Sequence, residues 1–595
     1  MGNIMSMLHL RNNVSRNGFD PSHRNAFTAK AGELLPVHVQ HAFPNTRYRI
    51  KLQSFTRTQP LETSAFTRMK EYYDFYFVPY RLLWRYSGQF FARTREKMFA
   101  ESLRAPTSTN SDSGQSFPTL MPHATMSSLI ETIDGRSDND IFGRPIKDSM
   151  MKLLHYLDYG SVDPEQYPSF SDETDVVNLM AFAAYQKIYF DFFRDSQWEV
   201  NEPLCYNFDY VNTDTDINLQ ILLLGNNNLL TLRYCNYPTD YFQGLLPNAQ
   251  YGDTATVDAG TVSGSGTASL TSLVLNNPNI IMGSGDVDPA VNVQYMRSGQ
   301  DGTFVINTNQ GLTSISSEDI VADASINVST NAMFSILDLR KAESKQRWSE
   351  ITQSNAKDYP SQMEAHFGKS VPHTLGNMCQ YIGGTSGILN INDVMNTNLD
   401  ESTDTPTAQK RAWIKGKGTI VNNGSIDFEP QEHGIIMCIY HIIPLLDYDA
   451  VGVDPFNIKT SAEDFAIPEF DNIGMQPTDA VQLNWKLKEL SSWLDNTILG
   501  YAPRYAEYKT AIDKVHGAFT TSLRSWYSPM SYDYMLNVLT SGKENWYIFK
   551  KVNPDILDSI FGVNADNTVD TDQFLVNSYF DVKCVLPLDR NGLPY

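Results

Sequence analysis

Few side chains in this 595-residue sequence have the types and spacing that catalysis or metal binding needs. His38 and His41 lie three positions apart in VHVQHAF, an apparent strand, so their rings leave opposite faces and are predicted to be structural. Asp214 and Asp216 alternate in NTDTDIN, but the glycine and the glutamate that an EF-hand loop requires are missing. We therefore expect no dedicated metal site and no cofactor.

Motifs for nucleotide binding and nucleophilic catalysis are also missing. The glycine-rich stretches SGSGTAS and GGTSG lack the Lys-Ser/Thr pair of a phosphate-binding loop and are predicted to be turns. The sequence contains no GxSxG elbow and no HExxH helix. A carboxylate pair for glycoside hydrolysis stays open, because the fold and not the sequence sets its spacing. The sequence favours a protein that is not an enzyme, with no catalytic residues.

The charge is distributed unevenly along the chain. The formal net charge is -22, yet residues 1–104 contain sixteen Lys or Arg against seven Asp or Glu, about +9, which leaves about -31 for the rest. A basic N-terminal region in an acidic chain suggests that this region binds a polyanion. The alternative is that its basic side chains pair with acidic surface elsewhere in the chain.

Cysteines and apolar runs indicate where the protein resides. Five scattered cysteines without a CxxC pair indicate reduced, buried thiols. The longest apolar run, GIIMCIYHIIPLL at 434–446, is too short to span a bilayer and predicts a buried strand. The first residues lack the apolar core of a signal peptide, so we expect no secretion and no membrane insertion.

Most of the secondary structure predicted from the sequence is β-strand. Residues 34–57 alternate apolar and polar side chains around Pro36 and Pro44, and residues 70–84 predict a strand that leaves its sheet at Pro79. A last strand is predicted over residues 573–588. Few helices, many strands and long loops predict a mainly β protein, an antiparallel sandwich or jelly roll.

Two helices are predicted in the first half of the chain. One covers residues 148–160, and the other begins near Asp175 and contains AYQKIYFDFFRD, residues 184–195. The second has an apolar arc of roughly 200°, about twice what one core requires. It should therefore have two apolar neighbours: its own sheet, and either an inserted loop or another subunit. A further helix is expected over residues 334–348.

Residues 248–330 differ in composition from the rest of the chain. The segment is rich in Gly, Ser, Thr and Asn, and it has eight acidic residues with Arg297 as its one basic residue. Runs such as SLVLNN, TFVINT and SINVST predict small strands joined by turns. We expect an acidic, outward-facing insertion.

Six segments, in the same order along the chain, resemble the major capsid proteins of microviruses, small single-stranded DNA phages, and most closely those of the gokushovirus-like and gut Bacteroidota branches. The segments are LLPVHVQHAFPNTRYRIKLQSFTR, YYDFYFVPYRLLW, AYQKIYFDFFRD, FSILDLRKAESKQRW followed by HFG, GYAPRYAEYK, and FLVNSYFDVKCVLPL. The resemblance spans most of the chain.

The resemblance implies a single eight-stranded antiparallel jelly roll with long loop insertions and a few helices. Sixty copies would form a T=1 icosahedral shell around a circular single-stranded DNA genome, assembled in the host bacterial cytoplasm. The implied order is a basic N-terminal arm at 1–33, jelly-roll strands with helical insertions at 34–247, a surface protrusion at 248–330, a helix with the return to the core at 331–370, and strands with long aromatic loops at 371–595.

The resemblance also implies partners and site residues. Arg11, Arg16, Arg24 and Lys30 would contact genome phosphates without reading sequence. On assembly a neighbouring subunit would cover Tyr185, Tyr189, Phe192 and Phe193; a helix enclosed within its own subunit is the alternative. Asp253, Asp286, Arg297 and Asp301 would lie on the protrusion, which would attach to a host surface receptor, such as a glycan. A small basic DNA-binding protein and pilot or scaffolding proteins are the other expected partners.

One alternative comes from a different class. A secreted or phage-borne β-rich glycan-binding protein or adhesin would also combine strands with many aromatic residues. The missing signal peptide and the missing disulfide framework argue against secretion. Adhesins are often built from repeats, and none are seen here.

Overall fold

The computed structural model describes residues 15–61, 65–92, 120–160, 176–210, 228–256, 336–372, 376–395, 414–449, 452–485, 498–527, 530, 545–561 and 571–590, and five short strands between 272 and 323. The chain divides into two compact units. The smaller unit is Asp253–Trp348, and the larger unit contains the residues on both sides of it.

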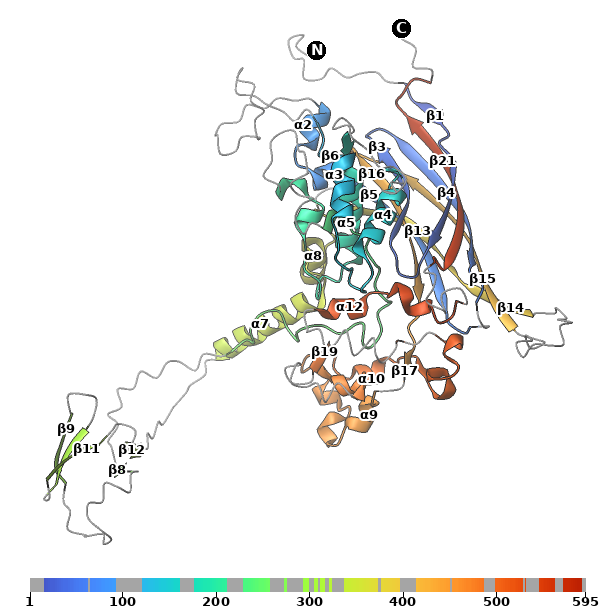
Figure 1. Ribbon diagram of the computed structural model, residues 1–595. Coiled ribbons are helices and arrows are strands. Elements are labelled where there is room, and N and C mark those ends of the chain that lie inside the picture. The colour runs from blue at the N-terminus through green and yellow to red at the C-terminus, as the bar shows by residue number, and fades with distance from the viewer. Residues whose placement is uncertain are drawn as a thin grey trace, which may run out of the picture. The chain divides into compact units, whose positions relative to one another are not determined.

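Two antiparallel sheets form the centre of the larger unit (Figure 1). The first sheet has the order β1 (Asn17–Phe19), β21 (Phe574–Leu586), β4 (Arg47–Thr58), β15 (Ile414–Phe428) and β14 (Asn390–Met395), and β2 (His23–Ala29) also pairs with β21. The second sheet has the order β13 (Gln380–Ile388), β5 (Met69–Pro79), β16 (Gly434–Pro444) and β3 (Leu35–Ala42).

The first sheet buries one face and exposes the other. Along β4, buried Tyr48, Ile50 and Leu52 alternate with exposed basic residues, and β21 alternates in the same way. This period of two is the pattern of a sheet that packs on a core with one face only. Buried residues of both sheets belong to one hydrophobic core.

The second sheet is covered on both faces. Every residue of β16 is buried, and β5 is buried without interruption from Phe75 to Pro79. Its second cover comes from helices: α4 (Ile146–Tyr156) contacts β3, and α5 (Met180–Ile188) contacts β5 and β16. Figure 1 shows these helices beside the strands of this sheet, with α3 (Met126–Asp134) next to them.

The prediction of a mainly β, antiparallel fold with few helices is confirmed. Residues 34–57 form β3 and β4 with a turn at Pro44, and β5 leaves its sheet at Pro79, where α1 (Tyr80–Leu83) follows. The prediction that the second helix begins near Asp175 is wrong. Residues 176–178 form β7 (Val176–Asn178), which pairs with β6 (His123–Thr125), and α5 starts only at Met180.

The remaining elements are short. A region of loops holds β17 (Tyr448–Asp449) parallel to β20 (Lys514–Val515), β18 (Gln476–Asp479) antiparallel to β19 (Ile498–Ala502), and the helices α9 (Pro455–Ile458), α10 (Ala506–Lys509) and α12 (Trp546–Lys550). Helix α2 (Ser87–Ala92) follows α1, and α8 (Tyr359–Phe367) follows α7 (Ile336–Ser354).

The smaller unit contains the expected small strands. In the part that the structure describes, β9 (Val293–Ser298), β10 (Phe304–Thr308) and β11 (Gly311–Ile315) form one antiparallel sheet, and β8 (Ser272–Leu275) pairs with β12 (Ile320–Asp323). SLVLNN and TFVINT supply β8 and β10, whereas SINVST lies outside the described residues. The predicted helix at 334–348 is the first part of α7, which continues to Ser354.

Candidate functional site

The helix with the wide apolar arc is enclosed by its own chain. All nine residues of α5 are buried, and a π-helical turn, Tyr189–Phe193, continues it. The Tyr185 hydroxyl donates to the Leu34 carbonyl at 2.9 Å and accepts from the Arg233 backbone N–H at 2.9 Å. The second neighbour is therefore an inserted loop around residues 228–234, as one of the two sequence-based alternatives had it.

The polar side chains of this helix, Gln186 and Lys187, are buried as well. The Gln186 amide donates to the carbonyls of Leu229 and Thr231 at 2.9 and 2.8 Å. Lys187 pairs with Asp191 at 2.8 Å, and both side chains are less than one tenth exposed. Burial raises the pKa of Asp191, against the opposing effect of Lys187. Buried polar groups of this kind need partners, and the loop and the helix supply them.

The four interface candidates on this helix divide into two groups. Tyr185 and Tyr189 are 1% and 3% exposed, and the Tyr189 hydroxyl donates to Glu199 at 2.6 Å. A neighbouring subunit cannot cover side chains that are already enclosed, so the interface role predicted for these two is corrected. Phe193 is partly buried and packs against Tyr76, whereas Phe192 is 38% exposed. Phe192 thus stays an interface candidate.

From residue 15 on, where the structure describes it, the expected basic arm is in part built into the first sheet. Arg11 lies outside the described residues, and Arg16 is exposed. From Asn17 to Ala29 the chain forms β1 and β2, both paired with β21. Arg24 is exposed on β2, where its Nε donates to Asn577 at 2.6 Å. Arg16 and Arg24 are accessible to a polyanion.

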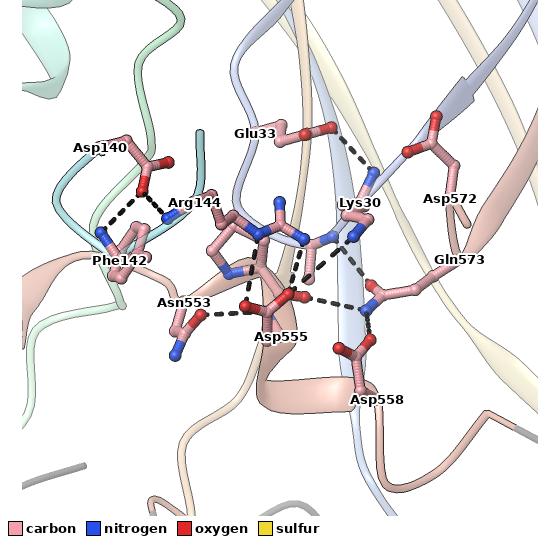
Figure 2. Close-up of polar contacts among 12 residues, drawn as sticks. Lys30, Glu33, Asp140, Phe142, Arg144, Asn553, Asp555, Asp558, Asp572 and Gln573 are labelled. Atoms are coloured by element: carbon pink, nitrogen blue, oxygen red, sulfur yellow. Dashed lines mark hydrogen bonds and ion pairs between the residues drawn. The ribbon is translucent and has the colours of Figure 1, made fainter. Parts of the chain in front are cut away.

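Lys30 belongs instead to a cluster of charges in which Lys30 and Glu33 are buried and the other members are partly exposed (Figure 2). Its Nζ lies 3.9 Å from Asp555, which also accepts from Arg144 at 2.6 Å. Glu33 accepts from the backbone N–H of Lys30 at 3.0 Å and pairs with Lys152 at 2.6 Å. The Lys30 side chain is 5% exposed, so it cannot reach a phosphate in this conformation.

The same cluster connects segments that lie far apart in the sequence. Lys152 on α4 also pairs with Asp572 at 2.9 Å, just before β21. Gln573 accepts from the Ala31 backbone N–H at 3.0 Å and donates to Asp558 at 2.9 Å. Burial opposes the charge of Lys152, but Glu33 and Asp572 outweigh it and raise its pKa. The cluster fixes the chain leaving β2 to α4 and to the start of β21.

The outward face of the first sheet is strongly basic. At outward positions of β2, β4, β15 and β21, the described side chains include seven Lys or Arg and two Asp: Arg24, Arg47, Arg49, Lys51, Arg57, Lys417 and Lys583, with Asp427 and Asp581. Sequence reasoning did not single out this face. The alternation of basic and apolar residues in RYRIKLQSFTR was the signal that could have found it.

The proposed protrusion residues are only partly described. Asp253 is exposed, and Arg297 lies on β9 opposite Val305 of β10. Asp286 and Asp301 lie outside the described residues, as do Asp214 and Asp216.

The structure agrees with a structural role for the histidines considered as metal ligands. His38 is buried, its ring stacks on Phe580 at 5.1 Å, and burial lowers its pKa to about 3. The His41 ring faces the Tyr80 hydroxyl. Among the described residues, no three His, Cys, Asp or Glu side chains are grouped closely enough to hold a metal ion. No helix in the described ranges combines the length and the apolarity needed to cross a bilayer.

Comparison with known proteins gives three phage capsid proteins as relatives. The chain is 21% identical to capsid protein VP1 of Chlamydia phage 1, over 98% of this chain and 96% of that protein. It is 22% identical to capsid protein VP1 of Spiroplasma virus 4, over 88% and 85%, and 22% identical to that of Bdellovibrio phage phiMH2K, over 86% and 83%.

A family model extends this likeness to most of the sequence. The model for the capsid protein (F protein) family matches residues 9–137 and 167–594. The predicted resemblance to microvirus capsid proteins is thereby confirmed, and the family implies a structural component of the virion. This chain belongs to the capsid protein (F protein) family of phages.

Proposed function

We propose that the chain is a major capsid protein that assembles, sixty copies at a time, into a T=1 icosahedral shell around a circular single-stranded DNA genome. A match across 98% of this chain and 96% of a phage capsid protein supports this proposal. The assembly would take place in the cytoplasm of a bacterial host.

The observation that carries the proposal is the order in which the strands pair. Eight strands in chain order are β2, β3, β4, β5, β13, β15, β16 and β21. The first pairs with the eighth, the second with the seventh, the third with the sixth and the fourth with the fifth, all antiparallel. This nesting is that of one long hairpin rolled into two sheets, and it supports a single eight-stranded jelly roll, an architecture of viral capsid domains.

Residues 248–330 are the proposed surface protrusion, and from Asp253 on they belong to the smaller unit. Their acidic, turn-rich composition suits exposure to solvent. We infer that this insertion takes part in attachment to a host surface receptor, such as a glycan. A small basic DNA-binding protein and pilot or scaffolding proteins complete the proposed set of partners.

Two groups of residues have proposed roles in the shell. Phe192 would contact a neighbouring subunit, because 38% of a large apolar side chain is left exposed beside a packed core. Arg11, Arg16 and Arg24 would face the genome, where Lys and Arg side chains bind phosphate without reading sequence.

The proposal is tested by expressing the chain alone and together with its neighbouring phage genes. We expect closed particles in negative-stain electron microscopy, with a protein mass of about 4.0 MDa, which is sixty copies of the 67.2 kDa chain. Monomers or trimers under every condition would overturn the proposal and favour a glycan-binding protein or adhesin, which a glycan array would then detect.

A further inference from the structure

The outward face of the first sheet carries a regular row of cations. On β4, outward Arg47, Arg49, Lys51, Gln53, Phe55 and Arg57 alternate with buried residues. Alternate residues on a strand are about 6.8 Å apart, a spacing comparable to that of successive phosphates in an unstacked nucleic acid strand. The row contains four cations and no carboxylate, in a chain whose net charge is -22.

Part of this charge is available to a ligand. Arg47 pairs with Asp427 at 2.6 Å, and Lys583 pairs with Asp20 and, at 3.2 Å, with Asp581. Arg49, Lys51 and Arg57 are exposed. Arg49 stands opposite Asp427 and Lys51 opposite Asp581 in the sheet, but these two carboxylates form their close ion pairs with Arg47 and Lys583 instead. An exposed cation without a carboxylate partner can bind phosphate and release counterions without first breaking an ion pair.

Aromatic rings lie among these cations. Tyr579 on β21 is 43% exposed, and it stands opposite Gln53 of β4 on one side and Arg24 of β2 on the other. Phe55 is half-buried, and the Arg57 guanidinium lies 4.9 Å from the centre of its ring. A cation beside a ring on one surface is the combination that binds single strands, because phosphates meet the cation and unpaired bases stack on the ring.

One end of the face is hollowed. The hollow has a volume of about 860 Å³, and the cationic side chains that line it are those of Arg47, Arg49, Lys583 and Arg590. Asp20 and Asp427 supply the acidic part of the lining. The lining therefore contains four cations and two carboxylates. This excess of positive charge favours binding of an anionic group such as phosphate.

We propose that this face binds a segment of single-stranded DNA, with phosphates on Arg49, Lys51 and Arg57 and bases stacked on Tyr579 and Phe55. The inference rests on the proposed function, which supplies the single-stranded genome as the ligand. A duplex fits less well, because its bases are stacked on each other and cannot reach the rings. A second copy of this chain also fits less well, because the centre of a stable subunit interface is depleted of charge.

The test uses the full-length protein and a fluorescent oligo-dT, with affinity measured by anisotropy over a range of salt concentrations. For single strands, the slope of log K against log salt changes by about 0.7 for each phosphate contact. Combined Arg49→Gln, Lys51→Gln and Arg57→Gln substitutions should therefore reduce the slope by about 2. The matched control removes three exposed lysines elsewhere, Lys357→Gln, Lys369→Gln and Lys509→Gln, and should leave the slope unchanged.

A second variant separates DNA from other polyanions. Tyr579→Ala should weaken oligo-dT binding roughly tenfold through lost stacking and leave binding of inorganic polyphosphate unchanged. Tyr579→Phe should retain the affinity for oligo-dT. Equal losses for both ligands with Tyr579→Ala would overturn the stacking role.

Particle formation distinguishes this inference from the proposed function. If the triple variant forms shells and its salt slope equals that of the unaltered chain, the inference is wrong and the capsid function stands. If the slope is unchanged and shells are lost, the face is a subunit contact, which also overturns the inference. If the unaltered chain forms no shells, the proposed function fails, while the oligonucleotide titration still decides whether the face binds DNA.

Discussion

The Arg144 guanidinium donates to the Asp555 carboxylate at 2.6 Å, and this contact joins the turn before α4 to the short 3-10 helix Pro554–Leu557. Asp555 also lies 3.9 Å from the ammonium of Lys30, which is 5% exposed. One carboxylate therefore balances two cations from distant parts of the sequence.

Asp555→Ala is predicted to destabilise the larger unit. The substitution leaves the buried Lys30 ammonium and the Arg144 guanidinium without this carboxylate, and the expected loss is about 2 kcal/mol, since Asp555 itself is partly exposed. Urea unfolding followed by tryptophan fluorescence measures the loss. Asp471→Ala removes an exposed pair with Lys509 and serves as the control, with an expected change below about 1 kcal/mol. Equal effects of the two substitutions would contradict the role of the cluster.

Glu71 is predicted to make stability depend on pH near neutrality. Its carboxyl group lies inside the sandwich, where it accepts from the Thr56 hydroxyl, and burial raises its pKa to about 7. The folded state therefore holds the proton more tightly than the unfolded chain, whose pKa is 4.5. Stability should fall as pH rises from about 4.5 through 7.

The measurement for Glu71 compares the unaltered chain with Glu71→Gln between pH 5 and pH 8. The amide stays neutral, so the variant should lack this part of the pH dependence and should be more stable at pH 8 by up to about 3 kcal/mol. The two chains should have similar stability at pH 5. Parallel pH profiles would show that Glu71 does not titrate in this range.

Phe192→Asp is predicted to block assembly without unfolding the subunit. The side chain is 38% exposed, so a carboxylate there stays hydrated in the free subunit and is buried only if a neighbour covers it. Circular dichroism should be unchanged while shells disappear from electron micrographs. Tyr189→Asp places a charge at a position that is 3% exposed and should unfold the subunit. Normal shells from Phe192→Asp would exclude an interface at this residue.

Replacing residues 257–335 with a short Gly-Ser linker is predicted to leave the sandwich intact. The replaced residues belong to the separate smaller unit, and none of the strands of the two large sheets is removed. Shells should still form, while adsorption of the particles to a susceptible bacterium is lost. Failure to form any shells would show that the insertion contributes to subunit contacts.

Most of what could be predicted of the fold came from the alternation of apolar and polar residues with a period of two. Arg47–Thr58 alternates because one face of β4 meets the core and the other is exposed, and a single sequence displays such a contrast directly. Gly434–Pro444 is apolar because both faces of β16 are covered. These patterns do not specify which strand pairs with which, because β21 and β2 are separated by more than 540 residues.

The candidate site was harder to predict, because its residues depend on contacts between distant segments. The width of the apolar arc on α5 indicated a second neighbour, but nothing local distinguished the loop that holds Arg233 from another subunit. Lys30 was predicted to belong to a basic arm. Its partner Asp555 lies 525 positions further along the chain, so the sequence near Lys30 does not indicate the ion pair. The charges of the basic face come together only when β4, β21 and β2 pair in register, and the sequence does not specify that pairing.

The position of β21 between β2 and β4 has a consequence for synthesis on the ribosome. Its partners are translated hundreds of residues earlier and expose unpaired backbone groups until Phe574–Leu586 emerges. A nascent or truncated chain that lacks this strand therefore has an open central gap in the sheet and no completed sandwich. Translation through Phe574–Leu586 thus acts as a checkpoint, since only a chain that includes this strand can complete the sandwich and the surfaces that a growing shell recruits.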